Sequence, residues 1–144
     1  PNGKIYFAPC QARQVLCIDP ESQAVEMLGP EIRGFGKYAS PGVVAGNGLI
    51  YFAPFEATQV LCIDPETQTV HLLGPCISKG FGKYSAGGVL APNGRIYFAP
   101  ALASQVLSID PQAGTVELLE PAMQGMGKYF AEGVLAPDGR IYFA

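Results

Sequence analysis

The sequence Ile-Tyr-Phe-Ala-Pro occupies residues 5–9 and decides the fold, because it returns at residues 50–54 and 96–100. Its first four residues return once more at 141–144. Successive copies are separated by 45, 46 and 45 residues. A period of this length indicates a structural unit that is repeated along the chain.

Further landmarks recur in the same order, so the repeat covers the whole chain. They are Gln-Val-Leu at residues 14–16, 59–61 and 105–107, Ile-Asp-Pro at 18–20, 63–65 and 109–111, and Gly-Lys-Tyr at 36–38, 82–84 and 127–129. The extra residue of the second period falls near Ser78 and Lys79, in an expected loop where an insertion costs little.

Each period predicts four short strands, as the third period illustrates. The four expected strands are residues 88–91, 95–99, 105–109 and 115–119. Asn93-Gly94 predicts a two-residue hairpin turn of type I′, because both residue types tolerate positive φ. Asp110-Pro111 predicts a second turn, in which proline presets φ and the Asp side chain can accept a hydrogen bond from a following backbone N–H.

Four antiparallel strands in each period of about 45 residues, repeated radially, predict an all-β fold of the β-propeller type. A β-solenoid is the main alternative, but its repeats are shorter and lack two hairpin turns per period. The chain would form an open arc of about three four-stranded blades. The expected blades are residues 1–29 (strands two to four), 42–74 and 87–120 (complete blades), and 133–144 (strands one and two).

Such an arc must be completed, because an open one leaves apolar faces and strand edges exposed. Two interpretations remain open. Two or three chains could form a ring of roughly six or nine blades, in which residues 5–8 and 141–144 would compete for one position. Alternatively, the chain is a piece of a longer array, which the missing initiator Met and the stop at Ala144 within a strand favour.

The composition of the 144-residue chain argues against several classes of protein. With 49% hydrophobic residues, 15% charged residues and a net charge of −3, the chain has ample surface to bury and is not disordered. No apolar run is long enough for a transmembrane helix, and no targeting segment is visible. A net negative charge without a basic run argues against nucleic-acid binding.

The blade sequence resembles known propeller repeats. Residues 88–99 (GVLAPNGRIYFA), 106–111 (VLSIDP) and 115–119 (TVELL) look like kelch-type or virginiamycin-B-lyase-type blades. They resemble still more closely the tandem IYxAP…VLxIDP…GGVLAP propeller repeats of unicellular algae, other protists and some corals. The resemblance covers the whole chain, and for the algal-type repeats it implies no activity.

Two departures from the kelch pattern argue against a kelch-type role as a ubiquitin-ligase adaptor. The kelch double glycine at the end of strand two is Ala-Pro in this chain. The kelch tryptophan of strand four is replaced by Val25, Val70 and Val116, and the chain contains no Trp.

The titratable residues predict neither a metal site nor a cofactor. No Cys-x-x-Cys pair occurs among the four cysteines, which are Cys10, Cys17, Cys62 and Cys76. His71 is the only histidine, and it is expected at a solvated strand edge. Turn capping is a sufficient role for the aspartates before proline, which are Asp19, Asp64 and Asp110. Free thiols weakly favour a reducing intracellular compartment.

The Gly-Lys-Tyr triplet is the motif with functional promise. Because strands alternate in direction, its loops share one face of the molecule with the loops between strands two and three. We call this the loop face. Six of the nine Lys and Arg residues are expected there: Arg13, Arg33, Lys37, Lys79, Lys83 and Lys128. The triplet lysines could form a ring of cations for an anionic ligand, with the tyrosines adding contact area. Alternatively, each Tyr wedges between blades while its Lys stem covers apolar surface.

Together these features predict a non-catalytic scaffold or protein-interaction module. Its partners would be another protein or further propeller blades, from the same chain or from copies of it. The candidate partner-binding residues are Arg13, Lys37, Tyr38, Lys83, Tyr84, Lys128 and Tyr129. The alternative is a propeller enzyme, a lyase or hydrolase, whose catalytic residues lie in blades outside this chain. The expected first strand of each repeat carries no titratable group, which favours the scaffold.

Overall fold

Thirteen short strands form the structure, a computed structural model that describes residues 2–78 and 80–144. They are β1 (Ile5–Phe7), β2 (Val15–Asp19), β3 (Ala24–Leu28), β4 (Val43–Val44), β5 (Ile50–Phe52), β6 (Val60–Asp64), β7 (Thr69–Leu73), β8 (Val89–Leu90), β9 (Ile96–Phe98), β10 (Val106–Asp110), β11 (Thr115–Leu119), β12 (Val134–Leu135) and β13 (Ile141–Tyr142). The described residues contain no helix, and therefore none that could cross a membrane. Lys79 lies outside the described residues.

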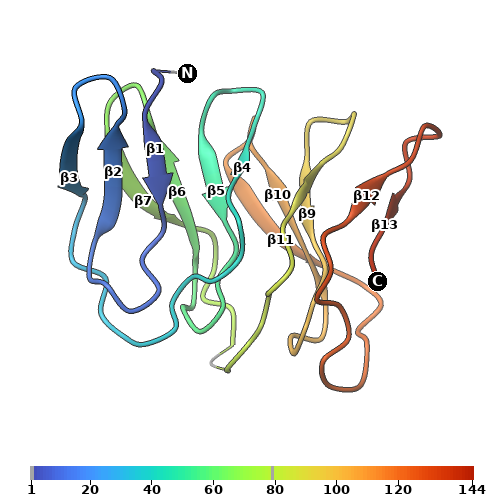
Figure 1. The fold of residues 1–144 in the computed structure, drawn as a ribbon. Helices are drawn as coiled ribbons and strands as arrows, with labels where there is room; N and C mark the ends of the chain where they lie inside the picture. Colours follow the sequence, from blue (N-terminus) through green and yellow to red (C-terminus); the bar gives the residue numbers. More distant parts are fainter. Residues whose placement is uncertain (1, 79) are drawn as a thin grey trace.

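The strands form four antiparallel sheets that follow one another in chain order (Figure 1). Sheet 1 is β1-β2-β3, sheet 2 is β4-β5-β6-β7, sheet 3 is β8-β9-β10-β11, and sheet 4 is the pair β12-β13. The first strands of sheets 2 and 3, β4 and β8, contact each other. The all-β fold class with an open arrangement of four-stranded sheets is confirmed.

The turns confirm one local prediction and correct another. Asp64 Oδ1 accepts hydrogen bonds from the backbone N–H groups of Glu66 and Thr67 at 2.9 and 3.3 Å, so the aspartate caps its turn. The predicted type I′ turn at Asn93-Gly94 is wrong. Ala91 and Arg95 close a three-residue turn, and only Gly94 has a positive φ, of 80°. A type I turn followed by a left-handed glycine explains this geometry, because the Pro before Asn93 has the fixed φ that such a turn needs.

Each sheet has two different faces, because side chains alternate along a strand. We call one the isoleucine face. In sheet 2 the strand register places its residues opposite one another: Ile50, Phe52, Leu61, Ile63 and Val70. We call the other the tyrosine face, which in sheet 2 carries Tyr51, Val60 and Cys62. The repeat gives sheets 1 and 3 the same two faces at equivalent positions.

The core forms where the tyrosine face of one sheet meets the isoleucine face of the next. Between sheets 1 and 2 the buried residues are Val15, Ile32, Tyr38, Phe52, Leu61, Ile63 and Val70. Between sheets 2 and 3 they include Tyr51, Val60, Cys62, Ile96, Phe98, Leu107, Ile109 and Val116. Removing this apolar area from water holds the sheets together face to face.

Glycine lets strand four of one sheet lie against the preceding sheet. Gly29 follows β3 with a φ of 75°, and a Cβ placed there would lie 2.5 Å from the Cβ of Val70 in sheet 2. Gly74 follows β7 with a φ of 81° and has the same relation to Val116 of sheet 3, again at 2.5 Å. No side chain fits at either position unless the sheets separate.

Candidate functional site

The lysines of the Gly-Lys-Tyr triplet are buried where two consecutive sheets meet. Lys37 is 2% exposed and Lys83 is 3% exposed. The Nζ of Lys37 donates to the carbonyl oxygens of Cys10 and Gly34 at 3.1 and 2.8 Å. The Nζ of Lys83 donates to Glu56 and Gly80 carbonyl oxygens at 3.2 and 2.8 Å. Burial lowers the pKa of Lys83.

The backbone of the same lysines connects the loops of neighbouring sheets. The N–H of Lys37 donates to the carbonyl of Cys10, which follows β1 of sheet 1, at 3.1 Å. The carbonyl of Lys37 accepts from the N–H groups of Phe55 and Ala57, which follow β5 of sheet 2, at 2.9 and 3.2 Å. Lys83 repeats this arrangement between sheets 2 and 3. Each lysine therefore clamps two sheets together.

The tyrosines next to these lysines also connect sheets. The hydroxyl of Tyr38 donates to the carbonyl oxygen of Gln59 at 3.1 Å, and that of Tyr84 donates to Gln105 at 3.0 Å. Both rings are buried. A buried phenol with its hydroxyl bonded matches the structural alternative, in which each Tyr wedges between adjacent blades.

The expectation of an exposed ring of cations is therefore wrong for Lys37 and Lys83. Their ammonium groups bond to backbone carbonyls inside the chain and are not presented to a ligand. Lys128 and Tyr129 are half-buried, since sheet 4, which would cover them, has two strands. Arg13 is exposed and lies 3.4 Å from Glu31, an exposed pair that contributes little stability. That these residues bind a partner stays a prediction.

Sequence reasoning missed the side chains that the loop face does expose. Phe35, Phe81 and Met126 are 78%, 65% and 85% exposed. Each stands between two glycines, two residues before the triplet lysine. That lysine's Nζ donates to the carbonyl of the first glycine, Gly34, Gly80 or Gly125, at 2.8 Å in all three repeats. The pattern Gly-Phe/Met-Gly-Lys-Tyr was the available signal for these side chains.

The exposed side chains lie beside the loops between strands two and three. Phe81 meets Phe55 edge to face, with ring centroids 5.1 Å apart. Phe35 lines a groove together with Gln11 and Arg13. Phe35 and Phe81 are therefore each accompanied by loop residues that come from a different part of the repeat.

The described residues supply little catalytic chemistry. They contain no group of three or more His, Cys, Asp or Glu side chains placed to hold a metal ion. His71 is exposed on β7, and its Nε2 lies 3.0 Å from Thr69 Oγ1. Cys10 and Cys76 are exposed thiols, whereas Cys17 and Cys62 are buried between sheets. None of these groups lies in a site with a base, an acid and a nucleophile in reach of one another.

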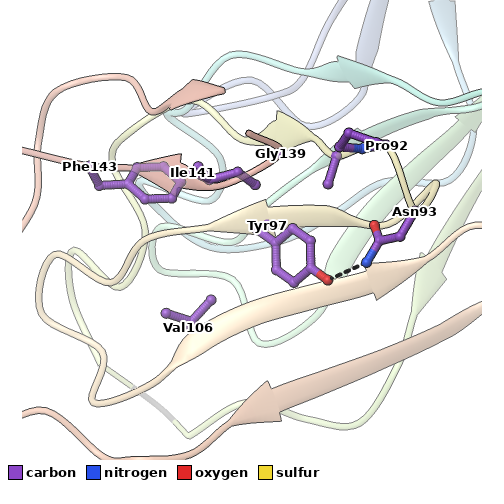
Figure 2. Close-up of a pocket in the computed structure, with 8 residues that line it drawn as sticks. Pro92, Asn93, Tyr97, Val106, Gly139, Ile141 and Phe143 are labelled. Carbon is purple, nitrogen blue, oxygen red and sulfur yellow. Dashed lines mark hydrogen bonds between the residues drawn. The ribbon is translucent and has the colours of Figure 1, made fainter. Parts of the chain in front are cut away.

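An open pocket of about 500 Å³ lies between sheets 3 and 4 (Figure 2). Its lining is mostly apolar: Ala91, Pro92, Asn93, Tyr97, Val106, Gly139, Ile141 and Phe143. Asn93 Nδ2 donates to the hydroxyl of Tyr97 at 2.9 Å. The equivalent tyrosine face of sheet 2 is covered by β10 and β11, so the pocket marks the positions that strands three and four would fill beside β13.

Alkaline pH is expected to destabilise the contacts between sheets. Burial raises the pKa of the Cys62 thiol to about 11, and it raises the pKa of the Tyr38 and Tyr84 phenols above their usual value. When a pKa is higher in the folded state, the contribution to stability is complete below the unfolded pKa and is lost as pH rises through the folded one. The free energy of unfolding should therefore fall from about pH 9 upwards.

A Cys62→Ser variant tests this expectation, because the third repeat has Ser108 buried at the same position. Urea unfolding at a series of pH values between about 7 and 11 should show a shallower alkaline decline than in the wild type. Cys10→Ser, which replaces an exposed thiol, is the matched control and should leave the decline unchanged. Equal slopes for all three proteins would contradict the role given to Cys62.

Comparison with known proteins finds similar solved structures. No protein-family model and no curated protein matches the chain. Virginiamycin B lyase from Staphylococcus aureus is 17% identical, with a TM-score of 0.71 over 99% of this chain and 45% of that chain. A streptogramin B lyase is 20% identical, with a TM-score of 0.71 over 98% of this chain and 44% of that chain.

A third similar structure is an auxiliary nutrient binding protein from Bacteroides ovatus, 19% identical, with a TM-score of 0.61 over 99% of this chain and 33% of that chain. The chain thus spans less than half the length of these proteins. Likeness at such low identity shows the fold and not the activity. The more specific resemblances to kelch and protist repeats stay predictions. The chain is an open segment of a β-propeller.

Proposed function

We propose that this chain is a non-catalytic interaction module that binds a protein partner through its loop face. The observation that supports this most is the exposed apolar side chain that recurs in each repeat at Phe35, Phe81 and Met126. Large exposed apolar side chains that cluster on one face are typical of interaction sites. A rigid β scaffold that carries variable loops is a common basis for binding.

The lysine clamp strengthens this proposal, because it holds each apolar tip in a defined position. The Nζ of Lys37 and of Lys83 each donates to one carbonyl in the loop that carries the exposed side chain and to one in the loop between strands two and three. A side chain that is already ordered loses less conformational entropy when a partner covers it. Phenylalanine and methionine are both enriched at protein interfaces relative to the rest of the protein surface.

The surface around the tips favours a protein over a small anion. The repeats differ in the loop between strands two and three, which contributes Gln11 and Arg13 in the first repeat, Glu56 and Thr58 in the second, and Leu102 and Ser104 in the third. A partner that covers all three tips would meet a different surface at each one. A symmetric ring of cations, which an anionic ligand would need, is not formed by Lys37 and Lys83.

A photo-reactive phenylalanine at position 81 tests the proposal in an extract of the source organism. Because Phe81 is 65% exposed, the replacement should leave the fold intact. A covalent adduct with one defined protein is expected, and Phe35→Ser or Met126→Ser in the same chain should reduce its yield. The matched control places the photo-reactive residue at Glu66, in the turn on the opposite side. Equal adducts from positions 81 and 66 would contradict the proposal.

The alternative of a propeller enzyme would draw its catalytic residues from blades outside this chain. The likeness to two lyases is a likeness of fold. The described residues place no set of catalytic groups together, so the interaction module is the better supported proposal.

A further inference from the structure

The isoleucine face of sheet 1 is exposed, although the same face is buried in sheets 2 and 3. Val25 is 61% exposed, whereas its equivalents Val70 and Val116 are 9% and 8% exposed. Ile5 and Phe7 are also exposed, and Leu16 and Ile18 are half-buried. Their equivalents in sheet 3 are fully buried: Ile96, Phe98, Leu107 and Ile109. A face with this composition is expected to have an occupant.

The two internal interfaces specify the chemistry of that occupant. In both, the covering surface is a tyrosine face, with Tyr, Val and a small residue on its central strands. In both, a glycine of the covering sheet, Gly29 or Gly74, leaves room for the valine of strand four. An occupant of sheet 1 therefore needs a tyrosine face and a glycine opposite Val25.

The far end of the chain offers a tyrosine face but lacks this glycine. Sheet 3 carries Tyr97, Val106 and Ser108, and beside them is the open pocket at sheet 4 (Figure 2). The residue equivalent to Gly29 and Gly74 is Glu120. Its carboxylate accepts hydrogen bonds from Gln105 Nε2 and from the N–H of Ala122, both at 2.9 Å. The third repeat thus departs from the pattern at the position that strand four of a following blade would meet.

We propose that the exposed isoleucine face of sheet 1 is a docking surface for a further blade of this repeat, one that has a glycine opposite Val25. A second copy of this chain cannot act as that blade, because it has Glu120 in place of the glycine. The proposal concerns an end of the arc and is independent of the loop-face partner.

The physical reason is both steric and electrostatic. In a head-to-tail pair, β2 and β3 of one copy would fill the open positions beside β13 of the other, and Val25 would lie against position 120. At the internal interfaces even a Cβ at this position would lie 2.5 Å from the valine. A glutamate is much larger, and pressing valine onto its carboxylate would remove water from the charge without supplying a new partner.

In a head-to-tail pair, β1 of one copy and β13 of the other would compete for the same position beside β2. This competition does not by itself prevent the pairing. β1 and β13 begin with the same Ile-Tyr sequence and hold the same position in the repeat. Either strand can therefore pair with β2, and exchanging one for the other changes few contacts. The junction between two copies would differ from the internal junctions at one position, which holds Glu120 in place of Gly29 or Gly74.

Glu120→Gly tests the proposal in the full chain, with light scattering over a concentration series as the readout. The wild type should show no association that depends on Val25. The Glu120→Gly variant should self-associate about tenfold or more tightly, because its end then matches the internal junctions. Adding Val25→Asp should return the variant to the wild-type mass. Val44→Asp, which places the same charge on an exposed apolar position of β4 in sheet 2, is the matched control and should leave association unchanged.

Two results would overturn the proposal. The first is a Glu120→Gly protein that folds, as circular dichroism would show, yet keeps the wild-type mass at every concentration and does not bind labelled wild-type chain. The second is a wild type that already forms oligomers which Val25→Asp dissociates, since Glu120 would then be no barrier. The photo-crosslinking experiment at position 81 tests the loop face alone, so its failure would not count against the proposal for sheet 1.

Discussion

A Gly74→Glu variant is expected to lose about 3 to 5 kcal/mol of unfolding free energy, a large part of the stability of a small domain. Its new Cβ would lie 2.5 Å from the Cβ of Val116 in sheet 3, and its backbone holds a φ of 81° that side chains disfavour. The overlap with Val116 cannot be relieved without separating sheets 2 and 3, whose contact is the larger part of the core. Urea unfolding followed by tyrosine fluorescence measures the loss.

Gly94→Glu separates the two causes, because the chain offers a glycine with the same backbone and no neighbour. Gly94 has a φ of 80°, and a Cβ there would meet nothing within 4 Å. This control should lose only about 1 to 2 kcal/mol, the cost of the left-handed backbone alone. Gly74→Glu should cost less in a Val116→Gly background than in the wild type, because the Cβ and both methyl groups that the new side chain would meet are then absent. If the Gly74 and Gly94 variants were equally destabilised, close packing of the sheets would not be what requires glycine at position 74.

Lys83→Met is expected to lower the free energy of unfolding by about 2 to 4 kcal/mol. Methionine keeps the length and apolar stem of lysine but has no donor for the carbonyls of Glu56 and Gly80. Because Lys83 is 3% exposed, water cannot readily replace the ammonium group at these carbonyls. The loss should appear in urea unfolding at neutral pH.

Lys128→Met is the matched control at the equivalent position of the third repeat. Lys128 is half-buried, and its Nζ donates to one carbonyl, that of Gly125, at 2.8 Å. Its replacement should cost less than about 1 kcal/mol, since solvent can reach the site. Similar losses for Lys83→Met and Lys128→Met would show that the clamp between sheets is not what stabilises the chain.

The local structure was largely predictable because its causes lie within a few residues. Ile-Tyr-Phe and Val-Leu-x-Ile alternate apolar side chains to two faces, which specifies strands such as β5 and β6 wherever the repeat returns. Asp64 caps its turn through a hydrogen bond that spans two residues. The type I′ turn at Asn93-Gly94 was mispredicted, because an Asn-Gly pair fits two turn geometries. The same three-residue turn forms at Asn47-Gly48, where a glycine replaces the proline.

The candidate site was only partly predictable, because exposure depends on residues far away in the sequence. Lysine is usually a surface residue and phenylalanine usually a core residue, so Gly-Phe-Gly-Lys-Tyr favoured the lysine as the exposed group. In the structure Lys83 instead reaches the Glu56 carbonyl, 27 positions earlier, and Phe81 faces solvent. Only the stacking of sheet 3 on sheet 2 creates the enclosed space in which Lys83 is buried with its ammonium group hydrogen-bonded to carbonyls.

By itself, then, the sequence determined the repeat, the strands, the turn caps and the all-β propeller class, since each follows from periodicity and short-range hydrogen bonding. The tertiary structure decided which faces of those strands are covered. Val70 and Val25 are the same residue type at equivalent positions of the repeat, yet one is buried and the other exposed, because only Val70 has a sheet packed against it. Burial is a property of the neighbour as well as of the residue, and the neighbour is supplied by the fold.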